Sequence, residues 1–347
     1  MSAGHSPARR EGDTPAGGVW GAMSGPPMSR IRAVVWAPLA SSAAGSSERR
    51  LAHRGSEGSA DAVEELFGRL MRFIGTVREI TASADTFPWG ALERLIQEVS
   101  GTLAKSDDLF WVANRVAAPP EDYLAFHQAR VAVLALRIGA GLGYEPRRLG
   151  ELGMAACLFD AGLWQVPEVV MRQADPLSAR EQELYRAHPR LGAALLRRWT
   201  PPSDVIVDAV QQRHEREQGQ GYPQGLRGPA IHPDAKIVGL ADTYAMLTLP
   251  PPPRVGRPAH EAVREIVRSR HRAFDPVLIK AMLHETSLFP PGTLVRVSNG
   301  EIGRVIGLNR NQPLRPRIEL LGPPGAVPRI VDLVESPFLY ITNPIAK

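Results

Sequence analysis

The chain is poor in cysteine and has no long apolar run. Cys157 is the only cysteine among 347 residues, which excludes an internal disulfide. A chain without disulfides suits a reducing compartment, so we expect a cytoplasmic location. No stretch approaches the roughly 18 consecutive apolar residues of a membrane-spanning helix, and we therefore expect no membrane span.

Blocks of one charge sign are missing as well. Lys and Arg number 41 against 36 Asp and Glu, and the net charge is +5. The arginines are spread along the chain rather than gathered in one block, so we expect no nucleic-acid partner, although the positive balance suits a small anionic ligand. The sequence also has no serine-triad pattern, phosphate-binding P-loop or cysteine zinc motif that would support another chemistry.

Composition divides the first third of the chain into two regions. Residues 1–58 are rich in Gly, Ser, Ala, Pro and Arg, which predicts a disordered, low-complexity tail. In the following region, 59–112, apolar residues recur at three- and four-residue steps over 63–80 and again over 92–99, which predicts two amphipathic helices. This helical N-terminal region could pack on the next domain, act as a small regulatory module, or form a hairpin that makes a homodimer.

The rest of the chain predicts a helical domain followed by a small β-module. Over 113–288 the apolar pattern is helical, interrupted by prolines and by a Gly-rich loop at 219–228. Over 289–347 short β-prone segments flank Asn299-Gly300, a strong hairpin signal, and two more such segments follow. We therefore expect a mainly α protein, an all-α helical bundle with a small, barrel-like β-module at its C-terminal end.

A series of short motifs occupies the predicted helical domain in one order. They are His127, the pair Phe159-Asp160, His188, the run Arg213-His214-Glu215, the triplet Gly221-Tyr222-Pro223, and Asp242. In this order and at this spacing the chain resembles the HD-GYP family, bacterial metal-dependent phosphodiesterases that hydrolyse cyclic di-GMP. Several motifs in one order make a chance match far less probable than a single short pattern does. The resemblance implies an HD-type bundle.

The resemblance also implies a site with two metal ions, of the kind that activates water and holds phosphate oxygens. In the family, histidines and aspartates supply the ligands, and one aspartate bridges both ions. The positions that keep such a residue here are His127, Asp160, His188, His214 and Asp242. We expect them to hold one divalent metal ion, iron, manganese or a similar ion, or none, with Asp160 as the candidate catalytic residue.

Three positions depart from the family pattern. Phe159 stands where the family has a histidine ligand, and a phenyl ring has no lone pair for a metal. Arg213 replaces a second histidine and brings a positive charge that it cannot lose. Leu163 replaces a lysine that contacts the substrate phosphate. Each metal would lack one ligand, which predicts a degenerate site with weak or absent hydrolysis.

Three residues are candidates for ligand binding. The planar guanidinium of Arg213 could take the place of a metal ion and grip a phosphate. Tyr222 could stack on the ligand, or Gly221-Tyr222-Pro223 could be an ordinary turn. Arg254, in the proline-rich run 250–258, corresponds to an arginine of a family loop. For Glu215 two roles stay open, as a partner that orients His214 or in an ion pair with a neighbouring arginine.

The resemblance therefore implies a protein of cyclic-di-GMP signalling that is weak or inactive as a phosphodiesterase and acts as a nucleotide sensor or an interaction module. Its ligand would be cyclic di-GMP or a related nucleotide, and its partner a protein with a diguanylate-cyclase domain. Two alternatives stay open. One is an active metal-dependent phosphodiesterase or phosphohydrolase with a mononuclear site, and the other is a ligand-free protein scaffold.

Overall fold

A computed structural model describes most of the chain from Glu57 onward. The described residues are 57–83, 85–114, 122–167, 177–252, 254–269, 272–286, 288–289, 292–309, 312–323 and 327–345. The tail expected at 1–58 lies outside them, except for its last two positions, which begin the first helix. None of the described helices combines the length and the apolar character needed to cross a bilayer.

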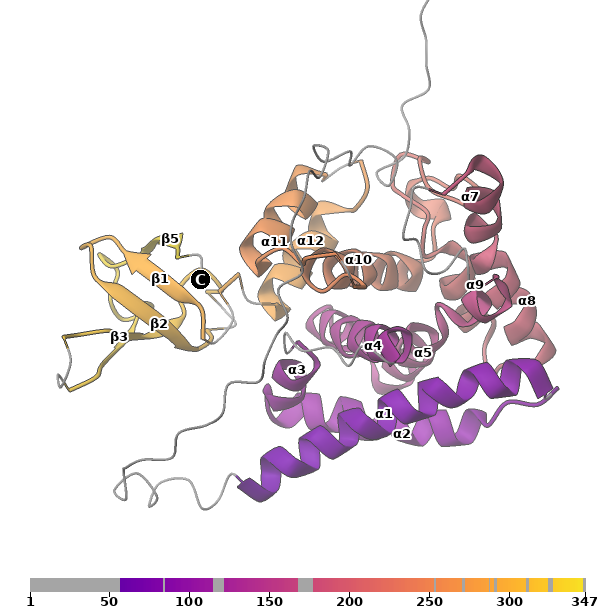
Figure 1. The fold of residues 1–347 in the computed structure, drawn as a ribbon, viewed down its shortest axis with the longest axis horizontal. Coiled ribbons are helices and arrows are strands. Elements are labelled where there is room, and N and C mark those ends of the chain that lie inside the picture. Colours follow the sequence, from indigo (N-terminus) through magenta and orange to yellow (C-terminus); the bar gives the residue numbers. More distant parts are fainter. Residues whose placement is uncertain are drawn as a thin grey trace, which may run out of the picture. The chain divides into compact units, whose positions relative to one another are not determined.

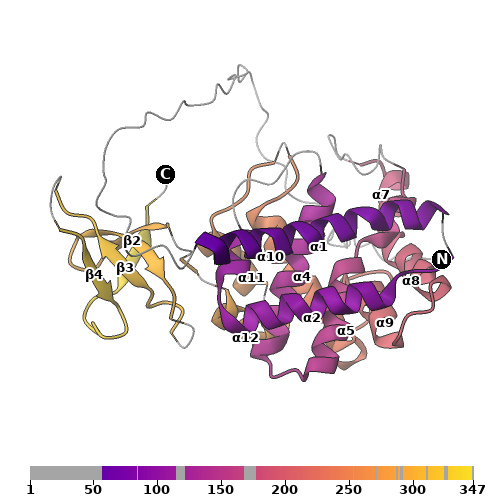
Figure 2. The same ribbon diagram turned by 90° about the horizontal axis from the view of Figure 1, so that it is seen from below.

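The two amphipathic helices predicted in the N-terminal region are present. Helix α1 spans Glu57–Ser83 and α2 spans Trp89–Lys105, and the two lie side by side (Figure 2). A short helix, α3, follows at Asp108–Ala113. Leu70 of α1 and Ile96 of α2 are fully buried in the same hydrophobic core as the following helices. Of the three roles left open for this region, packing against the next domain is therefore the one that the structure displays.

The helical domain is arranged around one central helix. Helix α4, Tyr123–Gly141, lies in the middle of the bundle (Figure 1), and its residues from Ala125 to Gly139 are all buried. The other elements are α5 (Pro146–Leu158), η2 (Ala161–Gln165), α7 (Ala179–Arg186), α8 (His188–Arg198), α9 (Asp204–Gln212), η3 (Gly228–Ala230), α10 (Pro233–Thr248), α11 (Ala259–Arg268) and α12 (Pro276–Glu285). Because α4 is covered on every side, it is apolar around most of its circumference rather than along one stripe.

Local sequence signals fix where several of these helices begin. The Asp122 side chain accepts a hydrogen bond from the backbone N–H of Ala125 at the start of α4, and Asp275 does the same for α12. Ser178 and Glu181 form a reciprocal capping box at α7. Such caps satisfy the free N–H groups of the first helical turn. The cap of α4 matters for the site, since it fixes the start of the helix one turn before His127.

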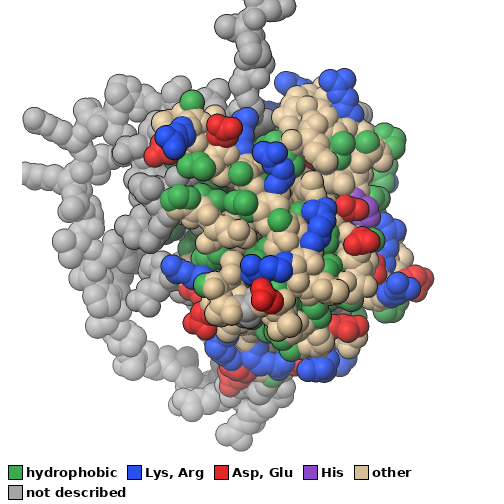
Figure 3. Space-filling view, turned by 90° about the vertical axis from the view of Figure 1, so that its right-hand side faces the viewer, with side chains coloured by type: hydrophobic (Ala, Val, Ile, Leu, Met, Phe, Trp, Pro, Cys, Tyr) green, Lys and Arg blue, Asp and Glu red, His purple; other side chains and the backbone are tan. Residues whose placement is uncertain are grey.

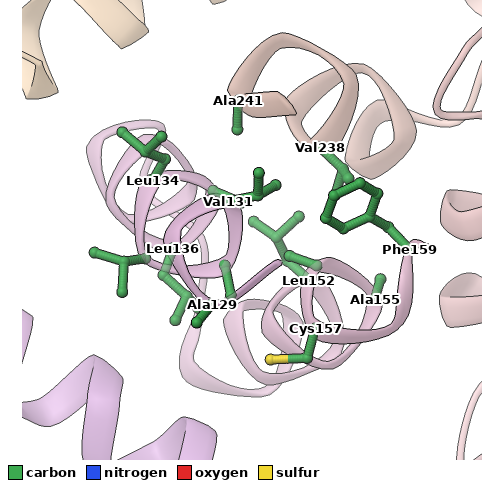
Figure 4. Close-up of a cluster of buried hydrophobic side chains, with 14 of the residues drawn as sticks. Ala129, Val131, Leu134, Leu136, Leu152, Ala155, Cys157, Phe159, Val238 and Ala241 are labelled. Carbon is green, nitrogen blue, oxygen red and sulfur yellow. The ribbon is translucent and has the colours of Figure 1, made fainter. Parts of the chain in front are cut away.

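The core of the bundle is packed closely between α4, α5 and α10. Figure 4 shows Val131 of α4, Leu152 of α5 and Val238 of α10 around the ring of Phe159. Helix α2 approaches α5 at Gly153, where a Cβ atom would lie 2.5 Å from a methyl group of Ile96. Only glycine permits that approach. The N-terminal helices and the bundle therefore share one interior.

The C-terminal region forms a five-stranded antiparallel sheet in the order β4-β3-β2-β1-β5. Its strands are β1 (Leu294–Val297), β2 (Ile302–Gly307), β3 (Arg317–Leu320), β4 (Arg329–Asp332) and β5 (Ile341–Pro344). Strands β1 and β2 form the predicted hairpin, with Gly300 at its turn at a φ of 90°. The sequence prediction missed β5. The expected fold class, mainly α with a small C-terminal β-module, is confirmed.

Candidate functional site

The five predicted ligand residues converge on one place in the bundle. They come from the second turn of α4, the end of α5, the start of α8, the end of α9 and the middle of α10. Each is at most 6% exposed: His127, Asp160, His188, His214 and Asp242. The side chains are joined to one another and to Arg213 by hydrogen bonds, so the cluster is a single polar network inside an apolar bundle.

The centre of this network is the guanidinium of Arg213. Its Nη2 donates to Asp160 Oδ1 and to His188 Nε2, the latter at 2.5 Å. Its Nη1 donates to Asp242 Oδ2 at 3.3 Å, and its Nε donates to the carbonyl oxygen of Phe159 at 3.0 Å. The side chain is only 1% exposed. Arg213 thus points inward, and its planar fork occupies the space between both carboxylates and His188.

Phe159 completes the enclosure of this cation. The guanidinium carbon of Arg213 lies 4.4 Å from the centre of the Phe159 ring, and the ring is fully buried. Its edge also contacts the imidazole of His127, with ring centres 5.8 Å apart. A guanidinium above an aromatic face is stabilised by about 0.5–2 kcal/mol. Phe159 and Arg213, two of the departures from the family pattern, therefore pack on each other.

The three histidines have their ring nitrogens directed at this network. His127 Nε2 lies 2.9 Å from Asp242 Oδ1, and His214 Nε2 lies 3.2 Å from His188 Nε2. His188 Nδ1 bonds to the carbonyl oxygen of Tyr185 at 2.6 Å, so that nitrogen carries the proton. The lone pair of His188 Nε2 is then the acceptor for Arg213. The nitrogen that a metal would need is already in use.

The electrostatics of the cluster favour the neutral forms of His188 and His214. Burial and the nearby charge of Arg213 hold the pKa of His188 and of His214 well below the ordinary value. Burial raises the pKa of Asp160 to about 6, although Arg213 opposes the change. For Asp242, burial is outweighed by the hydrogen bond with His127 and by the charges of His127 and Arg213, so its pKa is lowered.

This arrangement does not fit a metal ion. Both carboxylates and the free lone pair of His188 face the N–H groups of Arg213, which cannot lose its charge. A second cation about 4 Å away would meet a repulsion on the order of 4 kcal/mol per unit charge. Within the described ranges, no group of three or more His, Cys, Asp or Glu side chains is arranged to hold an ion.

Leu163 lies in a small apolar cluster that is separate from the main core. It is 5% exposed and packs with Val166 against neighbouring apolar side chains that include Tyr185. The preceding Gly162 lets this turn approach α8, because a Cβ there would collide with the carbonyl oxygen of His188. The position that carries a lysine in the family is thus directed into packing rather than toward a ligand.

Glu215 holds the Gly-Tyr-Pro loop. Its carboxylate accepts hydrogen bonds from the backbone N–H groups of Gln224, Gly225 and Leu226, at 2.7, 3.1 and 2.9 Å. Neither role expected for it, orienting His214 or pairing with a neighbouring arginine, is its main contact. Gly221 is required at the base of the loop, where a Cβ would collide with the carbonyl oxygen of His214. The Gly-Tyr-Pro motif therefore belongs to an ordered loop that is held by hydrogen bonds to Glu215.

Aromatic and basic side chains surround the edge of the network. The ring of Tyr222 stacks on His214 with centres 4.5 Å apart, and the ring of Tyr123 stacks on His127 with centres 5.7 Å apart. Both tyrosines are partly exposed. The guanidinium of the exposed Arg186 lies 5.5 Å from the Tyr222 ring centre, and the exposed Arg254 acts electrostatically on Tyr123. We call Tyr123, Arg186, Tyr222 and Arg254 the rim.

Sequence reasoning found half of the rim. Tyr222 and Arg254 were predicted, whereas Tyr123 and Arg186 were not. Tyr123 stands one helical turn before His127 on α4, a spacing that places both on one face and could have identified it. Figure 3 views the molecule from the side on which α7 and α8 lie, and there basic and acidic side chains are interspersed.

Comparison with known proteins agrees with the helical and β regions. The sequence matches the HD domain over residues 112–278 and the KOW domain associated with HD domain over residues 294–347. It is 29% identical over 226 residues to the cyclic di-GMP phosphodiesterase PA4108 of Pseudomonas aeruginosa, covering 65% of this chain and 54% of that protein.

Two further similarities support this relationship. The chain is 31% identical over 158 residues to the cyclic di-GMP phosphodiesterase response regulator RpfG of Xanthomonas campestris pv. campestris, covering 44% of this chain and 41% of that protein. The chain thus spans about half the length of the curated relatives it matches. Among solved structures, Bd1817, a HDG"Y"P protein from Bdellovibrio bacteriovorus, shares the fold with a TM-score of 0.52 at 18% identity, over 64% of this chain and 70% of that chain.

Proposed function

Because the chain belongs to the HD-GYP family, we propose that it is a member that binds cyclic di-GMP or a related nucleotide without hydrolysing it, and so acts as a sensor. The observation that carries this proposal is the position of Arg213 between Asp160, Asp242 and His188. In this proposal the guanidinium of Arg213 takes the place of the metal ion that the family chemistry needs.

The loss of hydrolysis follows from what the site residues are already doing. The family reaction depends on a metal ion, which lowers the pKa of bound water from about 15.7 to about 7. Here the groups that would hold the ion are hydrogen-bonded to Arg213. Asp160, the candidate catalytic residue, accepts a hydrogen bond from that guanidinium and is only 6% exposed. Its carboxylate is thus engaged by Arg213 rather than held ready to bind a metal ion.

Ligand recognition has a separate basis in the rim. Tyr123 and Tyr222 offer partly exposed aromatic rings, and stacking of a base on such a ring is worth about 1–3 kcal/mol. Arg186 and Arg254 supply positive charge for phosphate groups. Arg213 was expected to bind phosphate, but it is buried and hydrogen-bonded to protein acceptors. We therefore assign phosphate binding to Arg186 and Arg254 instead.

The decisive test is elemental analysis of the purified full chain, together with cyclic-di-GMP turnover in added manganese or iron. We expect metal far below one equivalent, no turnover above a protein-free blank, and saturable nucleotide binding by calorimetry. Tyr222→Ala should weaken that binding about tenfold through loss of stacking. Stoichiometric metal with turnover that Asp160→Ala abolishes would instead establish the mononuclear enzyme.

The scaffold alternative gives a different result in the same experiment. The wild-type chain would then show no affinity for any cyclic dinucleotide, and Tyr222→Ala would instead reduce binding to a protein partner such as a diguanylate-cyclase domain. A double variant, Phe159→His with Arg213→His, adds a positive control. It should regain metal binding, because it removes the internal cation and restores both missing ligands at once. Arg213→His alone should regain less, since Phe159 still fills its position.

A further inference from the structure

A cavity lies between the N-terminal helices and the bundle, apart from the Arg213 network. Its volume is about 200 Å³. Its walls come from α2, α4, α5 and α12, and they include the apolar side chains of Leu103, Leu136 and Leu149 together with Arg137 and Glu285. The cavity is therefore mainly apolar, with a charged pair in its lining.

Arg137 is the unusual group in this lining. Its side chain is 3% exposed, and it donates to Asp107 at 2.7 Å and to Glu285 at 3.3 Å while lying over the ring of Phe110. Among the described residues, no protein atom accepts a hydrogen bond from its Nε. A buried donor without an acceptor costs about 1–3 kcal/mol. The lining thus combines apolar side chains with Arg137, whose Nε–H is buried and has no acceptor among the described residues.

We propose that this cavity binds a small, uncharged molecule with a ring-sized apolar body and one hydrogen-bond acceptor. A cavity of roughly 150 Å³ is enough for a benzene ring. The charge of Arg137 is already matched by Asp107 and Glu285. A ligand carboxylate would face those two acids, and an ammonium group could not use the free N–H of Arg137. A hydroxyl or carbonyl oxygen satisfies it.

The position of the cavity indicates what such a ligand would do. It would contact α2 of the N-terminal region and α4 of the bundle at once. Helix α4 carries Arg137 near its C-terminal end and His127 near its N-terminal end. An occupant would therefore stabilise the packing of the N-terminal helices on the helix that carries part of the nucleotide site.

The test uses four ring compounds of similar size with the full chain: phenol, toluene, benzoate and benzylamine. Binding is followed by ligand-induced shifts in protein NMR spectra. We expect saturable binding of phenol, with toluene weaker by about tenfold because it lacks an acceptor for Arg137. Equal affinity for toluene and phenol, or tightest binding of benzoate or benzylamine, would overturn the assignment of ligand class. Failure of all four to bind would overturn the site itself.

A pair of matched variants locates the binding. Ala140 is an exposed residue at the entrance of the cavity, so Ala140→Leu should block the entrance without disturbing the core. Ala194 is an exposed alanine of α8 that does not line the cavity, and Ala194→Leu is its control. Phenol affinity should fall at least about tenfold in the first variant and stay unchanged in the second. An equal response of both variants would contradict the proposal. Nucleotide binding measured in parallel separates this result from the test of the sensor function.

Discussion

At the scale of single residues, Arg213 is the side chain on which the site depends. Both carboxylates of the network, Asp160 and Asp242, accept hydrogen bonds from this one cation and form ion pairs with it. A buried ion pair adds little stability compared with an apolar replacement of both partners, but the loss of one partner leaves the other charge buried and uncompensated. The network is therefore sensitive to change at its centre.

We predict that Arg213→Met destabilises the protein by about 3–5 kcal/mol, because methionine fills the space but leaves two buried carboxylates without their cation. Urea denaturation at neutral pH measures the loss. Arg147→Met is the matched control, since the Arg147 side chain is 90% exposed and its removal should cost less than about 0.5 kcal/mol. A variant at Arg213 that is as stable as the wild type would show that the guanidinium does not hold the network together.

The histidines predict a loss of stability in mild acid. The pKa values of His188 and His214 are lowered in the folded protein, so below about pH 6.5 the unfolded chain binds protons that the folded one does not. Each histidine then reduces the unfolding free energy by about 1.4 kcal/mol per pH unit. Asp160 opposes this between about pH 4 and 6, because its pKa is raised to about 6 and the folded protein keeps a proton there.

The free energy of unfolding should therefore fall by about 1.4 kcal/mol as the pH falls from about 6 to about 5. The reason is that the unfolded chain binds about one more proton than the folded protein over this range. Denaturation curves at about pH 7.5, 6 and 5 give this slope. Replacement of the exposed His284 by Gln should leave it unchanged. A free energy of unfolding that stays constant over this range would mean that the two histidines take up protons in the folded state.

At the scale of elements, the Gly-Tyr-Pro loop depends on one carboxylate that the sequence did not assign to it. Glu215 receives three backbone hydrogen bonds from 224–226 and is 3% exposed. We predict that Glu215→Gln raises amide hydrogen exchange in 224–226 by about tenfold or more, because hydrogen bonds to a charged acceptor are worth about 1.5–3 kcal/mol.

The matched control for the loop is Glu217→Gln. Glu217 pairs with Lys236 at 2.7 Å, and its side chain makes none of the bonds that Glu215 makes to the loop. Its replacement should leave exchange in 224–226 unchanged while the overall stability changes little. Equal protection of the loop in wild type and Glu215→Gln would show that the backbone turns alone are sufficient.

At the scale of the whole molecule, the N-terminal helices share the interior of the bundle. Ile96 of α2 is fully buried against α5. We predict that Ile96→Ala lowers the unfolding free energy by about 2–5 kcal/mol, through the cavity that it leaves. Circular dichroism and tryptophan fluorescence should shift together in denaturation. The exposed Val277→Ala, at 68% exposure, is the control, with an expected change below about 0.5 kcal/mol. Two separate transitions would contradict a shared core.

Sequence patterns predicted most of the elements and the ligand-type residues that converge at the site, but not Tyr123, Arg186 or the direction of the central side chain. Apolar periodicity predicted α1 and α2, and Asn299-Gly300 predicted the hairpin, because both signals are local. The orientation of Arg213 depends on Asp160, 53 residues earlier, and on Asp242, 29 residues later. The strand β5 was missed because it is short and half exposed, so it has no clear alternation.

The guanidinium of Arg213 is made with the chain, at one copy per molecule, and cannot dissociate. A metal ion in the same place would depend on what the cell supplies, would compete with other metals, and, if it were iron, would change with oxygen. Chelators, metal starvation and oxidative stress leave a guanidinium unchanged. The positive charge at the centre of this fold is thus encoded in the chain itself. It is in place as soon as the protein is folded and needs no step of metal loading.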